Sequence, residues 1–204
     1  MTADDHPVYR DGLAALLAVH DDLELVAEAG NGAIAIELFR EHRPDITLMD
    51  LSMPTMGGAE AIAKIVGEFP DARIIALTTY EGDADIHRAL SAGARGYLLK
   101  DVVRHEVVDA IRSVHRGGRL LPGVVAQRLA EFTPRIELTD REMEVLTFMA
   151  QGMSNKEIAS AIGRAESTVK VHVLHILAKL EVDDRTKAVT VALKRGIIHL
   201  GDPR

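Results

Sequence analysis

The first half of the chain alternates short, uninterrupted apolar runs with helical patterns, whereas the second half contains helical patterns only. The apolar runs cover residues 46–49, 74–77 and 97–99, and such runs are typical of strands buried on both faces. The helical patterns include an apolar stripe over residues 103–114 and a helix that starts at Pro7. Because strands separated by helices form right-handed crossovers, we expect an α/β domain whose parallel sheet carries helices on both faces.

The pattern changes after this α/β region. Residues 119–137 contain two prolines and one glycine around a short helical stretch, which favours a linker. From residue 138 onward the helical pattern continues without strand-like runs. We therefore expect a first domain over residues 1–118, a linker over 119–137 and an all-α domain over 138–204.

Composition excludes several classes of protein. The 204 residues include 47% hydrophobic residues and no cysteine, which rules out general disorder, a disulfide scaffold and a cysteine nucleophile. No apolar run approaches the ~20 residues of a membrane helix, and the first residues lack the apolar core of a signal peptide. We expect a soluble, cytoplasmic protein with no membrane partner.

The net charge of −7 argues against nucleic-acid binding only when the chain is taken as a whole. Residues 1–137 hold 22 acidic and 14 basic residues, a net charge of −8, whereas residues 138–204 hold 9 acidic and 10 basic residues, a net charge of +1. The acidity therefore belongs to the first domain and its linker.

Functional groups follow the apolar runs of the first domain. Asp50, Thr78 and Lys100 stand at the ends of three runs, and Asp4 and Asp5 lie just before the first helix. Parallel strands would gather these groups at one edge of the sheet, where clustered carboxylates repel one another unless a cation lies among them. Oxygen ligands suit Mg²⁺, and an aspartate beside Mg²⁺ can attack phosphorus. A hydroxyl and an ammonium group can hold the other phosphoryl oxygens.

This set of residues resembles the receiver domain of two-component response regulators. The resembling motifs are Asp4-Asp5-His6-Pro7, Asp50-Leu51-Ser52-Met53-Pro54, Leu77-Thr78 and Gly96-Tyr97-Leu98-Leu99-Lys100. The spacings of 28 residues from Asp50 to Thr78 and of 50 residues from Asp50 to Lys100 also match. The resemblance implies a CheY-like, flavodoxin-like doubly wound sheet and phosphorylation of Asp50 by a sensor histidine kinase.

The same resemblance implies roles for individual residues. The implied Mg²⁺ ligands are Asp5, Asp50 and the backbone carbonyl of Ser52, with Asp4 acting mainly through water. Thr78 would turn toward the phosphoryl group, and Tyr97 would move inward with it as the signalling switch. The receiver would catalyse phosphoryl transfer to Asp50 and its hydrolysis, without being a dedicated enzyme.

The segment before the acidic pair is shorter than the family's pattern. Only Met1, Thr2 and Ala3 precede it, where the family carries several apolar residues that form a central strand. Without that strand, its neighbours would have unpaired backbone groups. We therefore expect a start placed too late, a truncation or a weakened receiver, with Asp4 and Asp5 less well positioned.

The all-α domain has the spacing of a helix-turn-helix motif. Counted from Asn155, positions five, nine and fifteen are Ala159, Gly163 and Val169, which supply a small residue, a turn glycine and an apolar core residue. Three helix starts are predicted, capped by Thr139 in a capping box with Glu142, by Ser154 or Asn155, and by Glu166 or Ser167.

The second helix of this motif has an apolar face and an outer face. The apolar stripe is Val169, Val173, Ile176, Leu177 and Leu180, and the outer face is Thr168, Lys170, Val171, Leu174 and His175. In a helix-turn-helix the outer face enters the major groove of DNA. We expect Lys170 to reach guanine or phosphate, Val171 a thymine methyl, and Thr168 and Lys156 the backbone phosphates.

Residues 138–188 resemble the LuxR-type output domain. The resembling motifs are Leu138-Thr139-Asp140-Arg141-Glu142, Asn155-Lys156-Glu157-Ile158-Ala159 and Ser167-Thr168-Val169-Lys170-Val171-His172. Together with the receiver, they indicate the NarL/FixJ subfamily. Leu174 departs from the polar or basic residue common at its position, and is expected to contact a thymine methyl instead.

The last predicted helix is expected to mediate dimerisation. It presents Val189, Leu193 and Ile197 at spacings of four residues, and the resemblance implies that it forms the interface of the DNA-bound homodimer. A two-fold dimer would favour an inverted-repeat operator in double-stranded DNA. RNA polymerase is a further candidate partner.

The leading interpretation is a transcription regulator in which phosphorylation of Asp50 controls dimerisation and sequence-specific DNA binding. A second is an atypical regulator of the same fold that acts without phosphorylation. A third is an aspartyl-phosphate phosphohydrolase, which usually needs a second acid where this chain has Ser52. A fourth is a ligand-sensing regulator, which the acidic cluster and the absence of tryptophan oppose.

Overall fold

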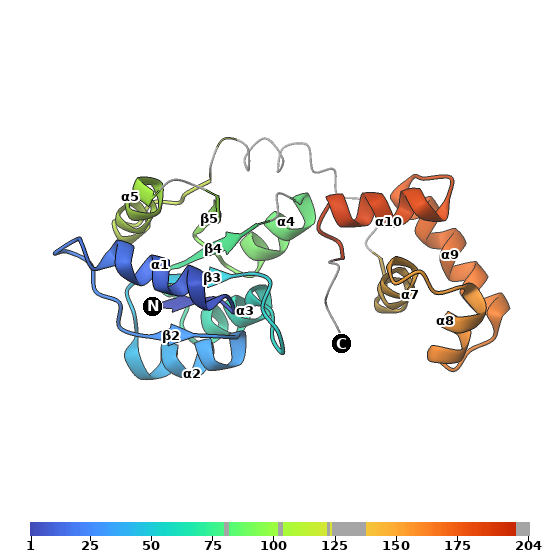
Figure 1. Ribbon diagram of the computed structural model, residues 1–204, viewed down its shortest axis with the longest axis horizontal. Coiled ribbons are helices and arrows are strands. Elements are labelled where there is room, and N and C mark those ends of the chain that lie inside the picture. Colours follow the sequence, from blue (N-terminus) through green and yellow to red (C-terminus); the bar gives the residue numbers. More distant parts are fainter. Residues whose placement is uncertain (80–81, 102–103, 122, 124–137, 199–204) are drawn as a thin grey trace. The chain divides into compact units, whose positions relative to one another are not determined.

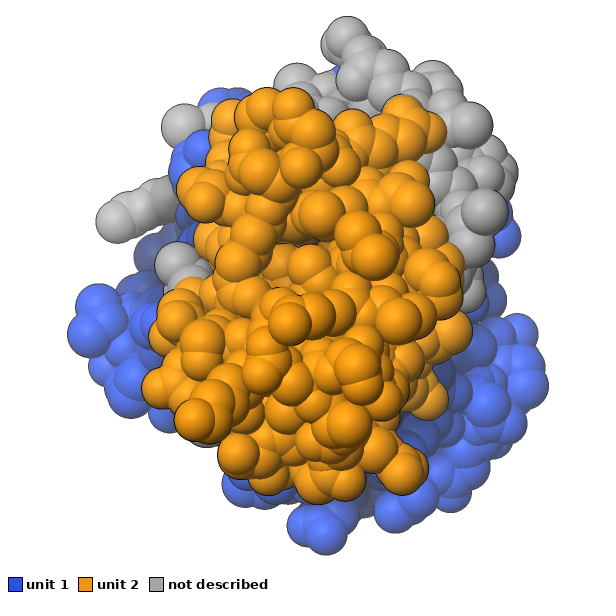
Figure 2. Space-filling model, turned by 90° about the vertical axis from the view of Figure 1, so that its right-hand side faces the viewer, with its two compact units in different colours: residues 1–81, 85–129 blue, residues 82–84, 130–204 orange. Residues whose placement is uncertain are grey.

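The computed structural model describes residues 1–79, 82–101, 104–121, 123 and 138–198. The chain divides into two units, one of residues 1–81 and 85–129 and the other of residues 82–84 and 130–204 (Figures 1 and 2). Most of the predicted linker, residues 122 and 124–137, lies outside the described residues. At its start, Leu120 forms a parallel bridge to Gly96 and packs against the core of the first unit.

The first unit contains a five-stranded parallel sheet with the order β2-β1-β3-β4-β5. The strands are β1 Thr2–Ala3, β2 Glu28–Ala29, β3 Thr47–Asp50, β4 Ile74–Thr78 and β5 Gly96–Leu99. β3, β4 and β5 are the three predicted apolar runs, and they are almost completely buried because helices cover both faces of the sheet. The predicted doubly wound α/β fold is confirmed.

Five helices of the first unit cover the sheet (Figure 1). They are α1 Pro7–Leu17, α2 Gly32–His42, α3 Gly58–Glu68, α4 Asp83–Ser91 and α5 Arg104–His115. α1 and α5 pack on one face through Leu13 and Ile111, and the core of the other face includes Ile36, Ile62 and Ile86 of α2, α3 and α4. Residue 103, the first of the predicted apolar stripe, lies outside the described residues.

The central strand that the short first segment left in doubt is present, so the loss of this strand, one of the alternatives considered, is contradicted. β1 is only two residues long, but it lies between β2 and β3 and pairs with both. Thr2 is opposite Glu28 on one side and Leu48 on the other. The backbone of Met1 extends the ladder, because its amino group donates to the Ile46 carbonyl at 3.0 Å. These contacts satisfy backbone groups that would otherwise be unpaired.

The described part of the second unit is helical, as predicted. Its helices are α7 Asp140–Ala150, α8 Asn155–Ala161, α9 Glu166–Leu180 and α10 Arg185–Lys194. One apolar core joins them, and it includes Val145, Ile158, Val169, Ile176 and Ala188. Among the described residues of the whole chain, no helix is both long enough and apolar enough to cross a membrane.

The helix caps are partly as predicted. Thr139 with Glu142 and Ser154 with Glu157 form complete capping boxes at the starts of α7 and α8. The prediction for α9 is wrong, because Glu166 is already its first helical residue and the N-cap is Ala165, which has no side chain able to accept a hydrogen bond.

The end of α10 also differs from the prediction. The helix ends at Lys194, so Ile197 lies beyond it and not on the helical stripe of Val189 and Leu193. Gly196 has a φ of 66°, and the N–H of Ile197 donates to the Ala192 carbonyl at 2.8 Å. This left-handed turn terminates the helix.

Candidate functional site

Asp50 and Lys100 meet at the carboxyl edge of the sheet. Asp50 is the last residue of β3, and Lys100 directly follows β5. The Lys100 Nζ lies 2.8 Å from the Oδ2 of Asp50 and 2.7 Å from the Oδ2 of Asp4. The strands are parallel, so side chains 50 residues apart in sequence reach the same edge, as the sequence predicted.

Burial changes the pKa values of Asp50 and Lys100. Burial raises the pKa of Asp50 because it disfavours the carboxylate, and Lys100 only partly offsets this. Burial also disfavours the Lys100 ammonium, but the carboxylates of Asp4 and Asp50 outweigh it and raise the pKa of Lys100. Lys100 is therefore a charged group held between two carboxylates.

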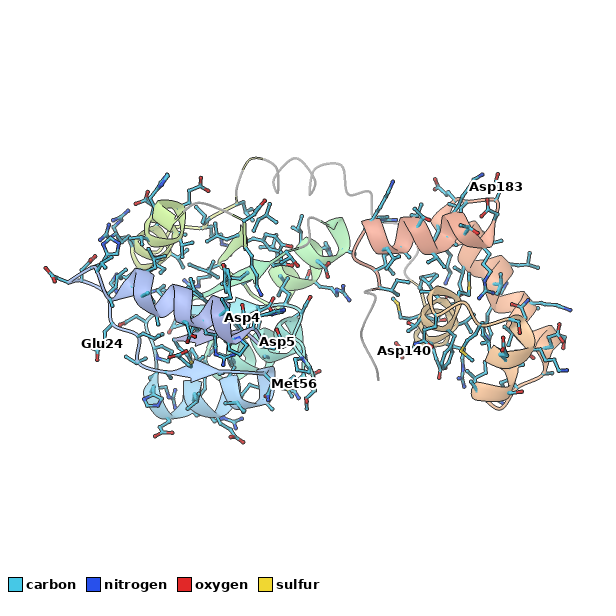
Figure 3. The ribbon with its side chains drawn as sticks, viewed as in Figure 1. Asp4, Asp5, Glu24, Met56, Asp140 and Asp183 are labelled. Atoms are coloured by element: carbon cyan, nitrogen blue, oxygen red, sulfur yellow. The ribbon has the colours of Figure 1, made fainter. Side chains whose placement is uncertain are left out.

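Asp4, Asp5, His6 and Asp50 form a cluster of candidate metal ligands. One ligand atom from each lies within 4.8 Å of the others. Asp4 and Asp5 lie together beside the start of α1 (Figure 3). The Asp4 and Asp50 carboxyls are buried, whereas the Asp5 side chain is 28% exposed. Three carboxylates with one side open to solvent fit a hard cation such as Mg²⁺.

Sequence reasoning did not single out His6 as a possible ligand. Its backbone N–H donates to the Asp4 Oδ1 at 2.9 Å, and its ring Nδ1 lies 2.7 Å from the Asp5 Oδ1. The sequence feature that could have identified His6 as a candidate ligand is its position directly after Asp4 and Asp5.

The other predicted receiver residues lie on β4, on β5 and in the loop after Asp50. Thr78 ends β4 next to β3 and is buried. Tyr97 lies in β5 and is fully buried in the core of the first unit. Ser52 is exposed, and its backbone N–H donates to the Asp50 Oδ1 at 3.2 Å. Whether its carbonyl binds a metal remains a prediction.

The loop after Asp50 is held closely against the start of α3. The Gly58 N–H donates to the Leu51 carbonyl at 3.0 Å. A Cβ at Gly58 would lie only 2.0 Å from the Asp50 carbonyl oxygen, so this position admits no side chain without moving the backbone of Asp50. Within the loop, Thr55 is exposed and has a left-handed φ of 70°.

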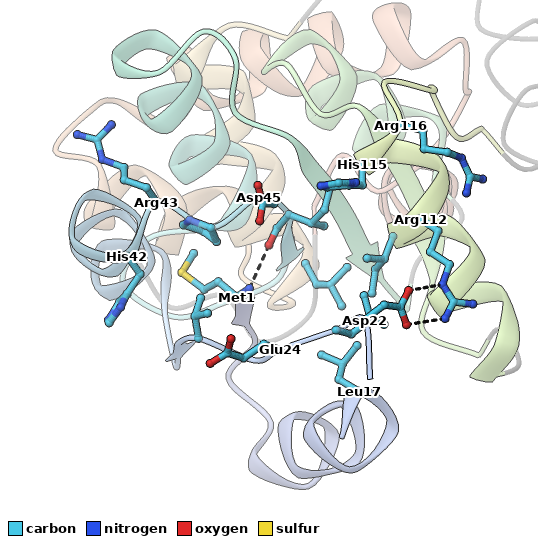
Figure 4. Close-up of a pocket in the computed structure, with 16 residues that line it drawn as sticks. Met1, Leu17, Asp22, Glu24, His42, Arg43, Asp45, Arg112, His115 and Arg116 are labelled. Atoms are coloured by element: carbon cyan, nitrogen blue, oxygen red, sulfur yellow. Dashed lines mark hydrogen bonds and ion pairs between the residues drawn. The ribbon is translucent and has the colours of Figure 1, made fainter. Parts of the chain in front are cut away.

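A cavity of the first unit is lined by residues outside this cluster (Figure 4). It has a volume of about 730 Å³ and lies at the amino ends of the strands, beside Met1 and Ile46. Its rim carries charges of both signs, including the hydrogen-bonded pair Arg112 and Asp22. No residue of the acidic cluster lines it.

The second candidate site is the outer face of α9. All five residues predicted for this face are exposed, and they are Thr168, Lys170, Val171, Leu174 and His175. The predicted apolar stripe instead packs into the core of the second unit. Val171 is 48% exposed and Leu174 is 64% exposed, so this face presents two aliphatic side chains beside polar ones. Lys156, on α8, is also exposed.

Charged contacts stabilise α9 and limit its free positive charge. The Lys170 Nζ lies 2.9 Å from the Glu166 Oε1 on the same helix. The His175 Nδ1 lies 3.7 Å from Glu142, and Lys179 contacts the same carboxylate at 2.6 Å.

The predicted dimer residues are less exposed than those of α9. Val189, Leu193 and Ile197 are partly buried against the core of their own unit. A role in dimerisation stays a prediction.

Two family models match the chain. A model described as the response regulator receiver domain matches residues 1–112, and one described as bacterial regulatory proteins of the luxR family matches residues 137–192. These matches include Asp50 and Lys100 in the first case and α7, α8 and α9 in the second.

Curated proteins and solved structures are similar to the chain over most of its length. The uncharacterized transcriptional regulatory protein YhcZ of Bacillus subtilis is 46% identical over 201 residues, covering 94% of both chains. The response regulator protein VraR of Staphylococcus aureus is 40% identical over 201 residues, covering 96% of both.

Among solved structures, the response regulator ChrA of a heme-sensing two-component system has 38% identity and a TM-score of 0.57, with 97% of both chains covered. A complex of the two-component response regulator RcsB with DNA has 25% identity and a TM-score of 0.65, with 95% of this chain and 96% of that chain covered.

Proposed function

Because the chain belongs to the two-component response regulators with a LuxR-type output domain, we propose that phosphorylation of Asp50 controls its binding to double-stranded DNA and thereby transcription. The phosphoryl donor would be a sensor histidine kinase. The active form would be a homodimer that recognises an inverted repeat.

One observation carries this proposal: the buried Asp50 carboxylate lies at the end of a central strand, 2.8 Å from an ammonium group and within a cluster of acids. A carboxylate in this position can attack phosphorus, forming an O–P bond while the bond from phosphorus to the donor nitrogen breaks. Lys100 would balance the charge of the transferred group. Thr78, at the end of the neighbouring strand, would donate its hydroxyl to a phosphoryl oxygen.

Asp5, Asp50 and the Ser52 carbonyl would hold Mg²⁺, with Asp4 acting mainly through water. When bound, Mg²⁺ supplies positive charge that neutralises the phosphoryl oxygens. The receiver would catalyse only phosphoryl transfer to Asp50 and its hydrolysis, so the chain would act as a switch and not as a dedicated enzyme.

Phosphorylation would change the population of two states of the receiver. Tyr97 is buried in β5, and its inward position would be stabilised when Thr78 turns toward the phosphoryl group. The active population would favour the dimer. Val189, Leu193 and Ile197 would contribute the parts of their side chains that their own core leaves exposed.

In the output domain, the exposed face of α9 would enter the major groove. Lys170 would leave Glu166 for guanine or phosphate, while Thr168 and Lys156 would contact phosphates and His175 would lie along the groove. The exposed aliphatic side chains of Val171 and Leu174 would pack on thymine methyl groups. The site would therefore read A·T pairs at these positions.

The direct test begins with the phosphorylation itself. The full chain is incubated with acetyl phosphate and Mg²⁺ and resolved on a phosphate-affinity gel. We expect a retarded band for the wild type that is absent for Asp50→Asn and absent when Mg²⁺ is chelated. A wild type without a retarded band under these conditions would favour the phosphorylation-independent regulator.

DNA binding is then measured on sites selected from a random double-stranded pool. The phosphorylated wild type should bind as a dimer and more tightly than the unphosphorylated protein, whereas Asp50→Asn should not respond to acetyl phosphate. Equal affinity of both proteins with and without the donor would contradict the switch. Rapid turnover of small phosphate esters would indicate the phosphohydrolase instead.

A further inference from the structure

We propose that His6 is a nitrogen ligand of the metal site and makes the receiver prefer first-row transition cations, such as Co²⁺ and Mn²⁺, over Mg²⁺. The inference rests on the proposed function, because it assumes that the acidic cluster binds a divalent cation. It adds a ligand and a metal preference to that site.

The spacing of the ligand atoms supports this role. The His6 Nδ1 lies 2.7 Å from the Asp5 Oδ1 and 3.3 Å from the Asp4 Oδ1. Neighbouring ligands of an octahedral ion with bonds of about 2.1 Å are about 3.0 Å apart. The two measured distances bracket this value, so the His6 Nδ1 and the Asp5 Oδ1 are close enough to be adjacent ligands of one ion, with Asp4 beside them.

His6 and Asp5 are in close polar contact. The Asp5 Oδ1 is buried, and the His6 Nδ1 lies 2.7 Å from it. A buried carboxylate oxygen is costly unless a hydrogen-bond donor, a cation or water satisfies it. A metal ion bound to both atoms would satisfy the carboxylate in place of the direct contact with the imidazole.

The ammonium group of Lys100 does not contact the atoms that face His6. Lys100 contacts the Oδ2 atoms of Asp4 and Asp50, so the Oδ1 of Asp4 faces His6 and not the ammonium group. The His6 side chain is 68% exposed, so its ring can adjust to an ion without disturbing the core. Its backbone is meanwhile held by the hydrogen bond to Asp4.

The donor set explains the expected preference. Mg²⁺ binds oxygen ligands almost exclusively, whereas imidazole nitrogen suits the later first-row metals, whose affinity rises from Mn²⁺ to Co²⁺ and beyond. One imidazole added to three carboxylates therefore adds binding energy for Co²⁺ and Mn²⁺, and little for Mg²⁺.

The test uses the unphosphorylated full chain and measures metal binding directly. Co²⁺ is titrated while its visible absorption is recorded, and Mg²⁺ affinity is obtained by competition with Co²⁺. In His6→Ala the Co²⁺ affinity should fall by at least about tenfold, with a change in the absorption band. The Mg²⁺ affinity should stay within about twofold. His105→Ala, which removes an exposed imidazole from α5, is the matched control and should change neither affinity.

The possible outcomes separate this inference from the proposed function. Unchanged Co²⁺ affinity in His6→Ala would overturn the role of His6 while leaving a Mg²⁺ site intact. An equal loss of Co²⁺ and Mg²⁺ affinity would show that His6 only positions the acids, and would also overturn it. Failure of the wild type to bind Mg²⁺, or binding that survives Asp50→Asn unchanged, would instead count against the proposed phosphorylation site.

Discussion

At the scale of single residues, the loop after Asp50 contains a strained position. Thr55 has a φ of 70° and an exposed, β-branched side chain. A non-glycine residue in this left-handed conformation is strained by roughly 1–2 kcal/mol, and glycine would remove that strain. Glycine would also lose more conformational entropy on folding, which cancels part of the gain. The strain lies in the segment that joins Asp50 to α3.

We therefore expect Thr55→Gly to stabilise the receiver by up to about 1 kcal/mol. Calorimetry of the full chain would measure this as a rise in the Tm of the receiver. The receiver's unfolding transition is expected to be the one whose Tm also rises when Mg²⁺ is added. Thr55→Ala, which keeps a Cβ, is the control and should give a smaller gain. A lower Tm for Thr55→Gly would mean that the threonine side chain stabilises the loop.

At Gly58, in contrast to Thr55, the structure leaves no space for any side chain. Its added Cβ would meet the Asp50 carbonyl oxygen at 2.0 Å, which is far inside contact distance. Gly58→Ala should therefore displace Asp50 and abolish the retarded band on the phosphate-affinity gel, together with a Tm several degrees lower. Gly67, in the same helix, has no atom within 4 Å of an added Cβ. Gly67→Ala should keep phosphorylation and stabilise α3 by about 0.5–1 kcal/mol. Phosphorylation of Gly58→Ala at the wild-type level would contradict this reading of the contact.

At the scale of secondary-structure elements, α8 and α9 differ in how they begin. Ser154 caps α8 by accepting from the Glu157 N–H, whereas Ala165 leaves the first N–H groups of α9 without a side-chain acceptor. An N-cap serine in place of alanine is worth about 1 kcal/mol. We expect Ala165→Ser to stabilise the output domain by about this amount in urea unfolding followed by circular dichroism. Ser154→Ala should lose a similar amount. If Ala165→Ser destabilised the domain, the assignment of Ala165 as the N-cap would be wrong.

Glu142 connects α7 to α9 and makes the stability of this domain depend on pH. Its carboxylate is buried, accepts a hydrogen bond from the Thr139 backbone N–H at 2.8 Å and lies 2.6 Å from the Lys179 Nζ. Burial disfavours its charge, but the hydrogen bonds from Lys179 and Thr139 outweigh burial and lower its pKa below 4.5. The folded state therefore binds this proton less readily than the unfolded state. The stabilisation is complete above the ordinary pKa and is lost as pH falls through the folded value.

Unfolding of the full chain between pH 7 and pH 3 would test this. Glu142→Gln should lose about 1–3 kcal/mol at pH 7, because the Lys179 charge loses its partner, and should show a weaker decline toward pH 3. The exposed Glu157 has a similar place in the capping box of α8, so Glu157→Gln should have a smaller effect. A wild-type slope that Glu142→Gln leaves unchanged would assign the pH dependence to other groups.

Most elements could be predicted because they follow from local patterns. The runs of β3, β4 and β5 and the spacing of Ala159, Gly163 and Val169 are periodic signals that tertiary contacts reinforce. Gly163 indeed has a left-handed φ of 64°. β1 could not be predicted, because two residues carry no periodicity and the strand depends on the neighbours that pair with it on both sides.

The candidate site shows a similar division. Asp50 and Lys100 could be placed together because parallel strands end at one edge. The position of His6 depends on how the ring turns toward Asp5, which no spacing encodes. The cap of α9 was predicted one or two residues too late because Ala165 lacks the polar side chain that marks a helix start.

At the scale of the whole molecule, the charge is unequally distributed. Residues 1–137 carry −8 and residues 138–204 carry +1. A near-neutral output domain has little long-range attraction for DNA, and Lys170 is already paired with Glu166. Binding should therefore depend on a few placed cations and on dimerisation, with a modest salt dependence for a DNA-binding protein.

The salt dependence can identify those cations one at a time. For the phosphorylated full chain on a selected site, the slope of log K against log salt should become shallower by about 1 for each Lys156 removed, so by about 2 in a Lys156→Gln dimer. Because phosphate contacts carry no sequence information, Lys156→Gln should weaken binding to all DNA sites equally.

Val171→Ala should leave the slope unchanged and reduce the preference for A·T over G·C at one position of each half-site. Lys64→Gln removes an exposed cation from α3 of the receiver and should change neither quantity. A Lys156→Gln slope equal to that of the wild type would remove this lysine from the DNA interface, and would leave the exposed face of α9 as its main part.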